Sequence, residues 1–180
     1  AFARAYFPYY DDRGGLRSRA STQQAFFENA GGSQVPKQVI DAVCSSLRCR
    51  NRSVIGTSTK AAAKDVFRTL LGASHHDIFL GANATSLLSV LAAQYARSGF
   101  LKKSDEIVIS SEKHLANGKP WVQAASTVGA IVKWWNPATA LIEEVLSSRT
   151  RLVAVPHASN ILGQILDVSS IRKAVDQVTL

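Results

Sequence analysis

The stretch that decides the fold runs from residue 106 to residue 135 and reads EIVISSEKHLANGKPWVQAASTVGAIVKWW. Residues 106–110 centre on three β-branched residues, which predicts a buried strand. After a polar turn, residues 120–128 predict a helix, because the proline at position 120 suits the first turn of a helix. Residues 130–135 predict a second strand. A strand, a helix and a strand in this order predict two parallel strands joined by a crossover.

The same alternation continues on both sides of this unit. Residues 77–80 and 152–155 predict two further short strands. Helical patterns cover the residues from 36 onward and the ranges 58–71, 87–96, 138–146 and 169–178. Short apolar strands that are each followed by a helix predict an α/β fold with a mainly parallel sheet, flanking helices and right-handed crossovers.

Length and composition predict one globular domain behind an N-terminal arm. Residues 1–24 mix aromatic, basic and serine residues and predict an extended arm, whereas residues 25–180 predict the domain. Apolar residues make up 46% of the chain, which is typical of a domain with a core. No apolar run approaches the roughly 20 residues of a membrane span. The chain opens on Ala1 and contains no methionine, which predicts processing or truncation.

The charge and the cysteines argue against several classes of protein. The formal net charge is +8, but its densest cluster, Arg48, Arg50 and Arg52, has no interleaved aromatic residues. Solvated faces are therefore favoured over a nucleic-acid surface, while an attraction for anionic small molecules stays open.

Cys44 and Cys49 are too few for a disulfide framework and lack zinc-ligand spacing. We therefore expect no metal, reduced thiols and a cytoplasmic location.

Polar residues follow the predicted strands, at the edge of a parallel sheet where ligands bind. Residues 81–86, GANATS, could hold a phosphate at a helix N-terminus or form an ordinary N-cap. His114 could act in acid–base chemistry, stack on a ring, or be a loop histidine without a role. Asn160 could hydrogen-bond a ligand or occupy a turn. His75 and His76 precede a predicted strand, which indicates a structural role.

Four segments resemble one family, in the family's order along the chain. Residues 27–36 (FENAGGSQVP) are similar to the segment D-N-A-A-G/T-x-x-V-P, and residues 81–86 are similar to the phosphate loop of the same proteins. Residues 114–121 (HLANGKPW) match H-x-A-N-x-x-P-W, and residues 158–163 (ASNILG) match x-S-N-x-L-G. From about residue 25 onward the chain resembles class V aminotransferases, in particular the cysteine-desulfurase-like branch of pyridoxal-phosphate fold type I.

This resemblance implies a site for pyridoxal 5′-phosphate (PLP). Ala84 and Thr85 would hold the phosphate of the cofactor through backbone N–H and hydroxyl groups. His114 would stack on the pyridine ring and could assist proton transfer. Asn160 would hydrogen-bond the phenolic oxygen of the ring. PLP acts as an electron sink, and the protein would supply orientation and control of charge.

The resemblance also implies a substrate and an assembly. Asn29, Ala30 and Gly31 would lie near an amino-acid substrate that reacts at its sulfur or its α-amino group. Members of the family are usually dimers, so the resemblance implies a homodimer in the full-length form. Neither nucleic acid nor membrane is expected as a partner.

The chain departs from the family pattern in ways that change the expectation. Glu28 stands where the family has Asp. Beyond Asn160, these 180 residues lack two family segments. One is D-A/G-x-Q/H, whose Asp pairs with the pyridine nitrogen, and the other is S-x-x-K, whose lysine forms a Schiff base with the cofactor. We therefore expect an incomplete large domain that binds PLP weakly and is inactive alone. The alternative is a non-catalytic pseudoenzyme or interaction protein on the same scaffold.

Overall fold

The computed structural model describes residues 6–7, 32–49 and 55–179. The chain divides into two compact units, Ala1–His76 and Asp77–Leu180. Of the predicted N-terminal arm, only Tyr6 and Phe7 are described, so its extended form stays a prediction.

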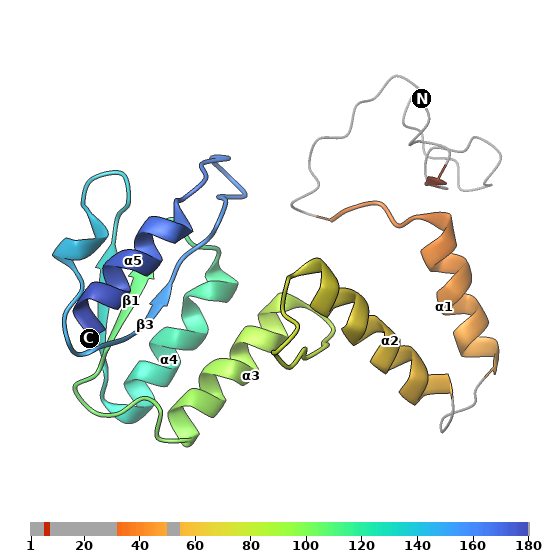
Figure 1. The fold of residues 1–180 in the computed structure, drawn as a ribbon, viewed down its shortest axis with the longest axis horizontal. Coiled ribbons are helices and arrows are strands. Elements are labelled where there is room, and N and C mark those ends of the chain that lie inside the picture. The colour runs from red at the N-terminus through yellow and green to blue at the C-terminus, as the bar shows by residue number, and fades with distance from the viewer. Residues whose placement is uncertain (1–5, 8–31, 50–54, 180) are drawn as a thin grey trace. The chain divides into compact units, whose positions relative to one another are not determined.

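The first unit contains two helices in its described part, α1 (Lys37–Cys49) and α2 (Ile55–Leu70) (Figure 1). The helix predicted from residue 36 is confirmed, and the carbonyl of Pro36 accepts from the amide of Val39 at 3.0 Å. The second predicted helix is also confirmed, although it begins at Ile55 rather than at residue 58. It ends before Gly72, whose φ of 61° is left-handed and stops the helix.

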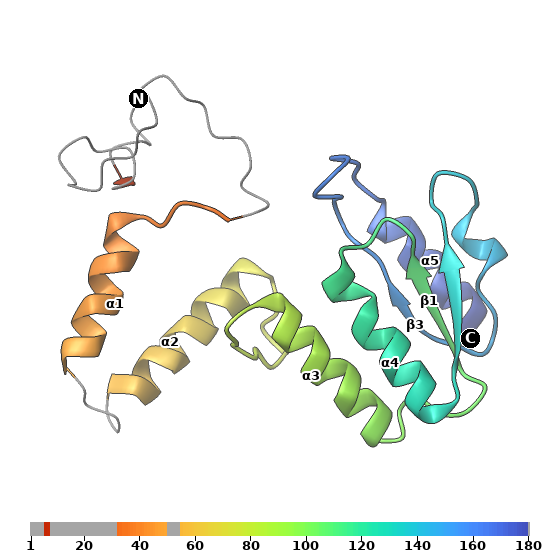
Figure 2. The same cartoon turned by 180° about the vertical axis from the view of Figure 1, so that it is seen from behind.

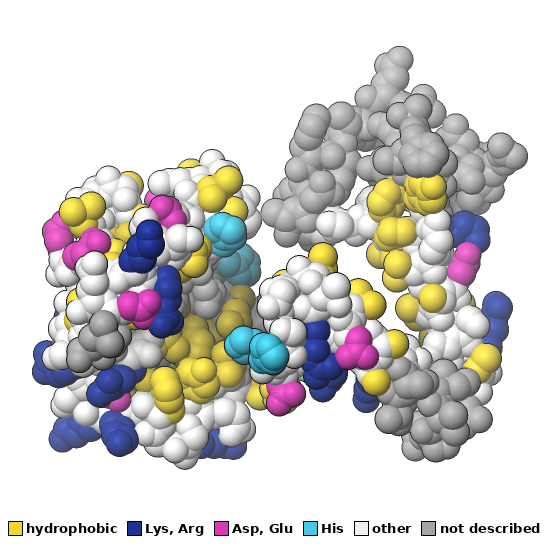
Figure 3. All heavy atoms as spheres, viewed as in Figure 1, with side chains coloured by type: hydrophobic (Ala, Val, Ile, Leu, Met, Phe, Trp, Pro, Cys, Tyr) yellow, Lys and Arg dark blue, Asp and Glu magenta, His cyan; other side chains and the backbone are white. Residues whose placement is uncertain are grey.

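One side of α1 carries exposed apolar side chains (Figure 3). Val39, Ile40 and Val43 recur at helical spacing, and all three are exposed. Leu47 continues the row and is 70% exposed. Cys44, on the same helix, is exposed and has a free thiol. The apolar spacing that predicted this helix therefore does not correspond to burial within the described part of the chain.

The second unit is built on three parallel strands, β1 (Glu106–Ser110), β2 (Ile131–Trp135) and β3 (Thr150–Ala154) (Figure 2). Their order in the sheet is β2-β1-β3, so β1 is central and is buried along its whole length. β1 pairs in parallel with both of its neighbours. The predicted α/β fold with a parallel sheet is confirmed. The parallel arrangement brings the carboxyl ends of all three strands to one edge.

Alternation along β1 divides the core between the two faces of the sheet. Ile107 and Ile109 point to the face that packs against α3 (Ala84–Arg97) and α4 (Lys119–Val128). Val108 points to the other face, against α5 (Val168–Thr179). Burying each such side chain stabilises the fold by about 1.5–3 kcal/mol. Among the described helices of either unit, none combines the length and apolar character needed to cross a bilayer.

The strand predicted at residues 77–80 is wrong. This segment does not join the sheet, and Phe79 is 78% exposed. An apolar run supplies side chains that suit a strand, but a strand also needs a neighbour that satisfies its N–H and C=O groups. The helix predicted at residues 87–96 is confirmed but begins earlier, at Ala84, so the predicted turn at residues 81–86 contains the first turn of α3.

The helix predicted at residues 138–146 is also wrong, because only the short 3₁₀ helix η5 (Ile142–Glu144) forms there. The carbonyl of Ala140, an acceptor that such a helix would use, accepts instead from Trp135 Nε1 at 2.9 Å. This local bond competes with the helical pattern. The bond from the amide of Ala138 to Asn136 Oδ1, at 3.0 Å, would be compatible with a helix start.

Candidate functional site

His114 lies in the turn that follows β1, immediately before the 3₁₀ helix η4 (Leu115–Asn117). Its Nδ1 accepts a hydrogen bond from the amide of Ala116 at 3.1 Å, so the histidine is the N-cap of η4. A nitrogen that accepts from an N–H carries no proton, which places the proton of the neutral ring on Nε2. The ring is exposed. All four histidines of the chain are exposed, and imidazoles are visible at the surface in Figure 3.

Asn160 lies in the loop that follows β3, which forms its own compact turn. The loop is closed by an antiparallel bridge between Ala158 and Ile165. Ser159 holds its tip, because its hydroxyl accepts from the amide of Leu162 at 3.1 Å and its carbonyl accepts from the amide of Gly163 at 2.9 Å. Asn160 is exposed, and its side chain makes no hydrogen bond to another described residue. The loop therefore presents an amide with free donor and acceptor groups.

Ala84 and Thr85 form the first turn of α3. Asn83 is the N-cap, and its Oδ1 accepts from the amide and the hydroxyl of Ser86 at 2.8 and 3.0 Å. The amides of Ala84 and Thr85 have no acceptor within the described part of the chain, as is usual for the first amides of a helix. The N-cap alternative therefore holds for Asn83, while two donors at the helix start remain open to an anion.

Gly81 lies in close contact with the side chain of Leu87 in α3. A Cβ atom at this position would lie 2.7 Å from Cδ2 of Leu87, which is closer than two carbon atoms approach. Glycine therefore permits the chain to pass over the first turns of α3.

The turn after β1 is joined directly to the end of β3. Asn117 Nδ2 donates to the carbonyl of Val155 at 3.3 Å, and Asn117 Oδ1 accepts from Trp121 Nε1 at 3.2 Å. η4 also packs against α3, and α3 and α4 run side by side with both N-termini on the side where the strands end (Figures 1 and 2). Ala84, Thr85, His114 and Asn160 therefore all lie on the carboxyl side of the sheet.

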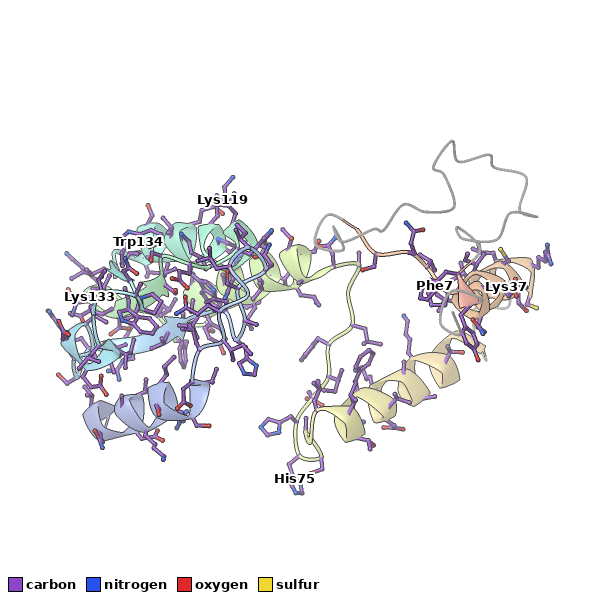
Figure 4. All side chains as sticks on the ribbon, turned by 90° about the horizontal axis from the view of Figure 1, so that it is seen from above. Phe7, Lys37, His75, Lys119, Lys133 and Trp134 are labelled. Atoms are coloured by element: carbon purple, nitrogen blue, oxygen red, sulfur yellow. The ribbon has the colours of Figure 1, made fainter. Side chains whose placement is uncertain are left out.

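Asn29, Ala30 and Gly31 lie outside the described residues, so their predicted place near the substrate stays a prediction. His75 and His76 belong to the turn after α2, and the carbonyl of His76 accepts from Arg68 Nε at 3.3 Å. The strand that was expected to follow them does not form, so their structural role reduces to this turn (Figure 4).

Two more features of the carboxyl edge concern charge. Lys113 Nζ lies 4.3 Å from the ring centroid of Trp134, which favours a cation–π contact. Trp134, labelled in Figure 4, is an exposed residue near the end of β2. Glu112 Oε2 is buried and has no hydrogen-bond partner in the described structure. A buried acceptor left without a donor costs about 1–3 kcal/mol, so this oxygen marks a place where a donor group would be stabilising.

A buried carboxylate occupies the opposite, amino-terminal end of the sheet. Glu106 is fully buried, and its oxygens lie 2.7 Å from Lys133 Nζ and 2.8 Å from Arg149 Nη2. The hydroxyl of Ser147 donates to Glu106 at 2.6 Å. Burial raises the pKa of Glu106, but the hydrogen bonds and charges of these three neighbours outweigh it, so the pKa lies below its ordinary value.

One groove in the described part of the chain lies away from the candidate site. It has a volume of about 300 Å³ and runs between the outer edge of β3 and α5. Its apolar lining includes Leu152, Val153 and Ile171, with Arg151 and Arg172 at its sides. None of the four predicted cofactor residues in the described part lines it. Among the described residues, no three His, Cys, Asp or Glu side chains gather in a way that could hold a metal ion.

Three residues of this site were not identified from the sequence, namely Asn83, Asn117 and Ser159. Asn83 could have been found, because an Asn just before a helix is a common N-cap. Asn117 precedes Trp121 by four residues at the start of a helix, which is a spacing that brings side chains together. The long-range bond of Asn117 to Val155 has no sequence signal.

Comparisons with known proteins agree with this architecture. The cysteine desulfurase CsdA of Escherichia coli superimposes with a TM-score of 0.70 at 23% identity, over 96% of this chain and 46% of that one. A C-DES mutant solved with glycine covalently linked to its PLP cofactor gives a TM-score of 0.68 at 17% identity, over 97% of this chain and 46% of that one. At these identities the likeness shows the fold alone, which is that of the predicted fold type I.

In sequence, a probable cysteine desulfurase of Halalkalibacterium halodurans is 32% identical over 162 residues, which are 81% of this chain and 40% of that protein. The chain spans less than half the length of the curated relatives it matches. The family model described as aminotransferase class-V matches residues 25–180. The resemblance found in the four sequence segments is thereby confirmed, and this chain belongs to the class V aminotransferase family.

Proposed function

We propose that this chain is the front part of the cofactor-binding domain of a PLP-dependent, cysteine-desulfurase-like enzyme that acts on an amino acid. The observation that carries the proposal is the joined edge at the ends of β1 and β3. There, exposed His114 and exposed Asn160 follow neighbouring strands that Asn117 ties together. When bound, PLP supplies an electron sink for reactions of amino acids.

The start of α3 is the proposed phosphate site. The amides of Ala84 and Thr85 are the open donors there, and the helix dipole favours a dianion at this position. Asn83 supports the site indirectly, because its bonds to Ser86 hold the first turn in helical geometry. Thr85 adds a hydroxyl donor.

His114 is the proposed stacking residue. The bond from the amide of Ala116 to Nδ1 fixes the ring against the backbone of η4 and uses the lone pair of this nitrogen. Nε2 is then the atom that holds a proton and can pass it to a ligand. A flat, exposed ring held in this way is suited to cover one face of a planar cofactor.

Asn160 is the proposed partner of the phenolic oxygen. Its Nδ2 group is a donor without a partner in the described structure, and the Ser159 bonds hold the loop that carries it. The donor set of this edge therefore fits an anionic, oxygen-rich ligand. Asn29, Ala30 and Gly31 remain the proposed substrate-side residues.

The lysine of β2 is not available to the cofactor. Lys133 Nζ is bound to Glu106 and, at 3.2 Å, to the carbonyl of Val145, near the amino end of the sheet. For the 180 residues alone we propose weak, reversible PLP binding without turnover. For the whole protein we propose a homodimer in the cytoplasm.

Borohydride reduction after the addition of PLP tests this proposal. We expect saturable PLP binding that His114→Ala weakens, together with no specific covalent labelling of Lys133. Lys60→Ala, on exposed α2, serves as the matched control and should bind PLP as the original chain does. Specific labelling of Lys133, or PLP binding unaffected by His114→Ala, would contradict the proposed site.

A further inference from the structure

The side chain of Asn117 connects three elements around the candidate site. Its Nδ2 donates to the carbonyl of Val155, 38 positions further along the chain and just beyond β3. Its Oδ1 accepts from the indole of Trp121 in α4. Its backbone amide donates to the carbonyl of His114 at 2.9 Å. A single residue thus connects the turn that carries His114 with α4 and with the exit of β3.

The two partners of Asn117 demand an amide. An indole N–H can only donate, so Oδ1 must face Trp121. A carbonyl can only accept, so Nδ2 must face Val155. An aspartate of the same size would offer no donor to Val155 at neutral pH. A leucine would offer neither group. The position therefore requires the donor and the acceptor of an amide, and a side chain of similar size without them does not replace Asn117.

Both partners of Asn117 are anchored in the core. Trp121 is 3% exposed, and its ring lies 5.7 Å from that of Tyr95 in α3. Val155 directly follows Ala154, which is 5% exposed at the end of β3. The turn between β1 and α4 is fixed to β2 at its start by the bond from the amide of Ser111 to the carbonyl of Trp135, at 2.7 Å. Asn117 fixes the end of the same turn to β3.

We infer that Asn117 is a positioning residue, which holds the His114 turn against the exit of β3 so that His114 and Asn160 face one ligand. The inference rests on the proposed function only for the identity of that ligand. The other hydrogen bonds around His114 in the described structure are local, such as the one from Ala116. Loss of the Asn117 amide frees the His114 turn and the Asn160 loop together.

The test is amide hydrogen exchange, measured by NMR in the full chain without cofactor. Asn117→Asp keeps the acceptor for Trp121 and removes the donor to Val155. We expect exchange to rise about tenfold, the equivalent of one lost hydrogen bond, at Gly118 in the turn and at Ser159 and Gly163 in the Asn160 loop. Unchanged exchange at Ser159 and Gly163 would overturn the inference.

Asn136→Asp is the matched control. Asn136 also follows a strand, β2, at the same edge, but its Oδ1 accepts only from Ala138, two residues along, in the described structure. The same substitution there should leave exchange at Gly118 and Ser159 as in the original chain. If it raised exchange in both loops to the same degree, the effect would be one of charge, and the assignment of Asn117 would be overturned.

A second variant keeps the inference testable if Asn117→Asp does not fold. Trp121→Phe retains a ring in the core but removes the N–H, so it should raise exchange at Gly118 and leave Ser159 protected through the remaining bond to Val155. Equal loss of protection at both residues would contradict the view that the bonds of Asn117 to Trp121 and to Val155 act separately.

PLP titration then separates the inference from the function on which it rests. We expect Asn117→Asp to weaken binding about tenfold, through lost alignment of His114 with Asn160. Absence of PLP binding in the original chain would count against the proposed function, while the exchange result would still decide the role of Asn117 as a tether. Unchanged PLP affinity alongside raised exchange in both loops would overturn Asn117 as a positioning residue.

Discussion

The two ends of the parallel sheet differ in the burial and the pairing of the polar side chains Glu106, His114 and Asn160. At the amino end, Glu106 is buried and receives hydrogen bonds or charge from Lys133, Arg149 and Ser147. At the carboxyl end, His114 and Asn160 are exposed, and the groups that would bind a ligand are open. Burial with complete pairing favours stability, whereas exposure with open donors leaves binding capacity. The amino end therefore contributes to stability, and the open donors at the carboxyl end are where we propose that a ligand binds.

Removal of the buried carboxylate should have the largest effect on stability. In Glu106→Ala, Lys133 and Arg149 lose their shared partner, and we expect the free energy of unfolding to fall by about 2 to 3 kcal/mol. This is at the low end for a buried ion pair because both cations are partly exposed and regain water. Urea unfolding measures the change. An unchanged midpoint would contradict the role of the amino end in stability. Asp176→Ala, which removes a partly exposed ion pair with Arg172 on the outer side of α5, serves as the surface control.

Acid should weaken the same end of the sheet. The pKa of Glu106 is lowered in the folded chain from an ordinary value of 4.5. Its contribution to stability is therefore complete above that value and is lost as the pH falls below it, toward the folded pKa. Unfolding followed from pH 7 to pH 3 should show this loss, and Glu106→Gln should reduce the slope. A residual slope is expected from Asp167, whose pKa is lowered chiefly by the Ser170 hydroxyl. Identical slopes in the two proteins would refute this origin.

The cap of α3 should contribute less. Asn83→Ala removes the acceptor of the Ser86 amide, and we expect a loss of about 1 kcal/mol in the free energy of unfolding. Thermal unfolding followed by circular dichroism measures it. Asn83→Ser retains a capping oxygen and should lie close to the original chain. Equal losses in the two variants would show that the side-chain oxygen does not cap the helix.

Asn160→Ala should have the smallest effect on stability and a clear effect on binding. The side chain is exposed and makes no bond to another described residue, so we expect a change within about 0.5 kcal/mol. The affinity for PLP should fall about tenfold, because a donor to the ligand is lost. Chemical denaturation and a PLP titration of one preparation give both values. A large loss of stability would place Asn160 with the structural residues instead.

The sequence predicted the sheet because its strands carry the signal themselves. The β-branched centre of β1 is buried on both faces, so composition and burial coincide. The strand expected at residues 77–80 is also apolar but has a single β-branched residue, Ile78, and it does not join the sheet. The sequence of one segment does not show which strand it would pair with. The helix expected at residues 138–146 does not form. Trp135 Nε1 occupies the carbonyl of Ala140, which that helix would use, and only the folded chain shows this bond.

For the candidate site, the sequence predicted positions better than connections. His114 and Asn160 were placed correctly after β1 and β3, because ligand sites in parallel sheets follow the strand ends. The sequence indicated that residues 81–86 could contain the N-cap of α3, but it did not identify Asn83 as the capping residue. The bond of Asn117 to Val155 could not be predicted, since it depends on the neighbouring positions of β1 and β3 in the sheet. Roles in binding stay predictions for all four cofactor residues.

The most direct measurement is an NMR titration of the ¹⁵N-labelled chain with PLP, following backbone amides across both ends of the sheet. The account predicts saturable shifts at Ala84, Thr85 and the turns that carry His114 and Asn160, with Glu106 and its neighbours unchanged. Shifts confined to the groove between β3 and α5, or to the Glu106 end, would contradict it. So would the absence of saturable shifts at the carboxyl ends of the strands.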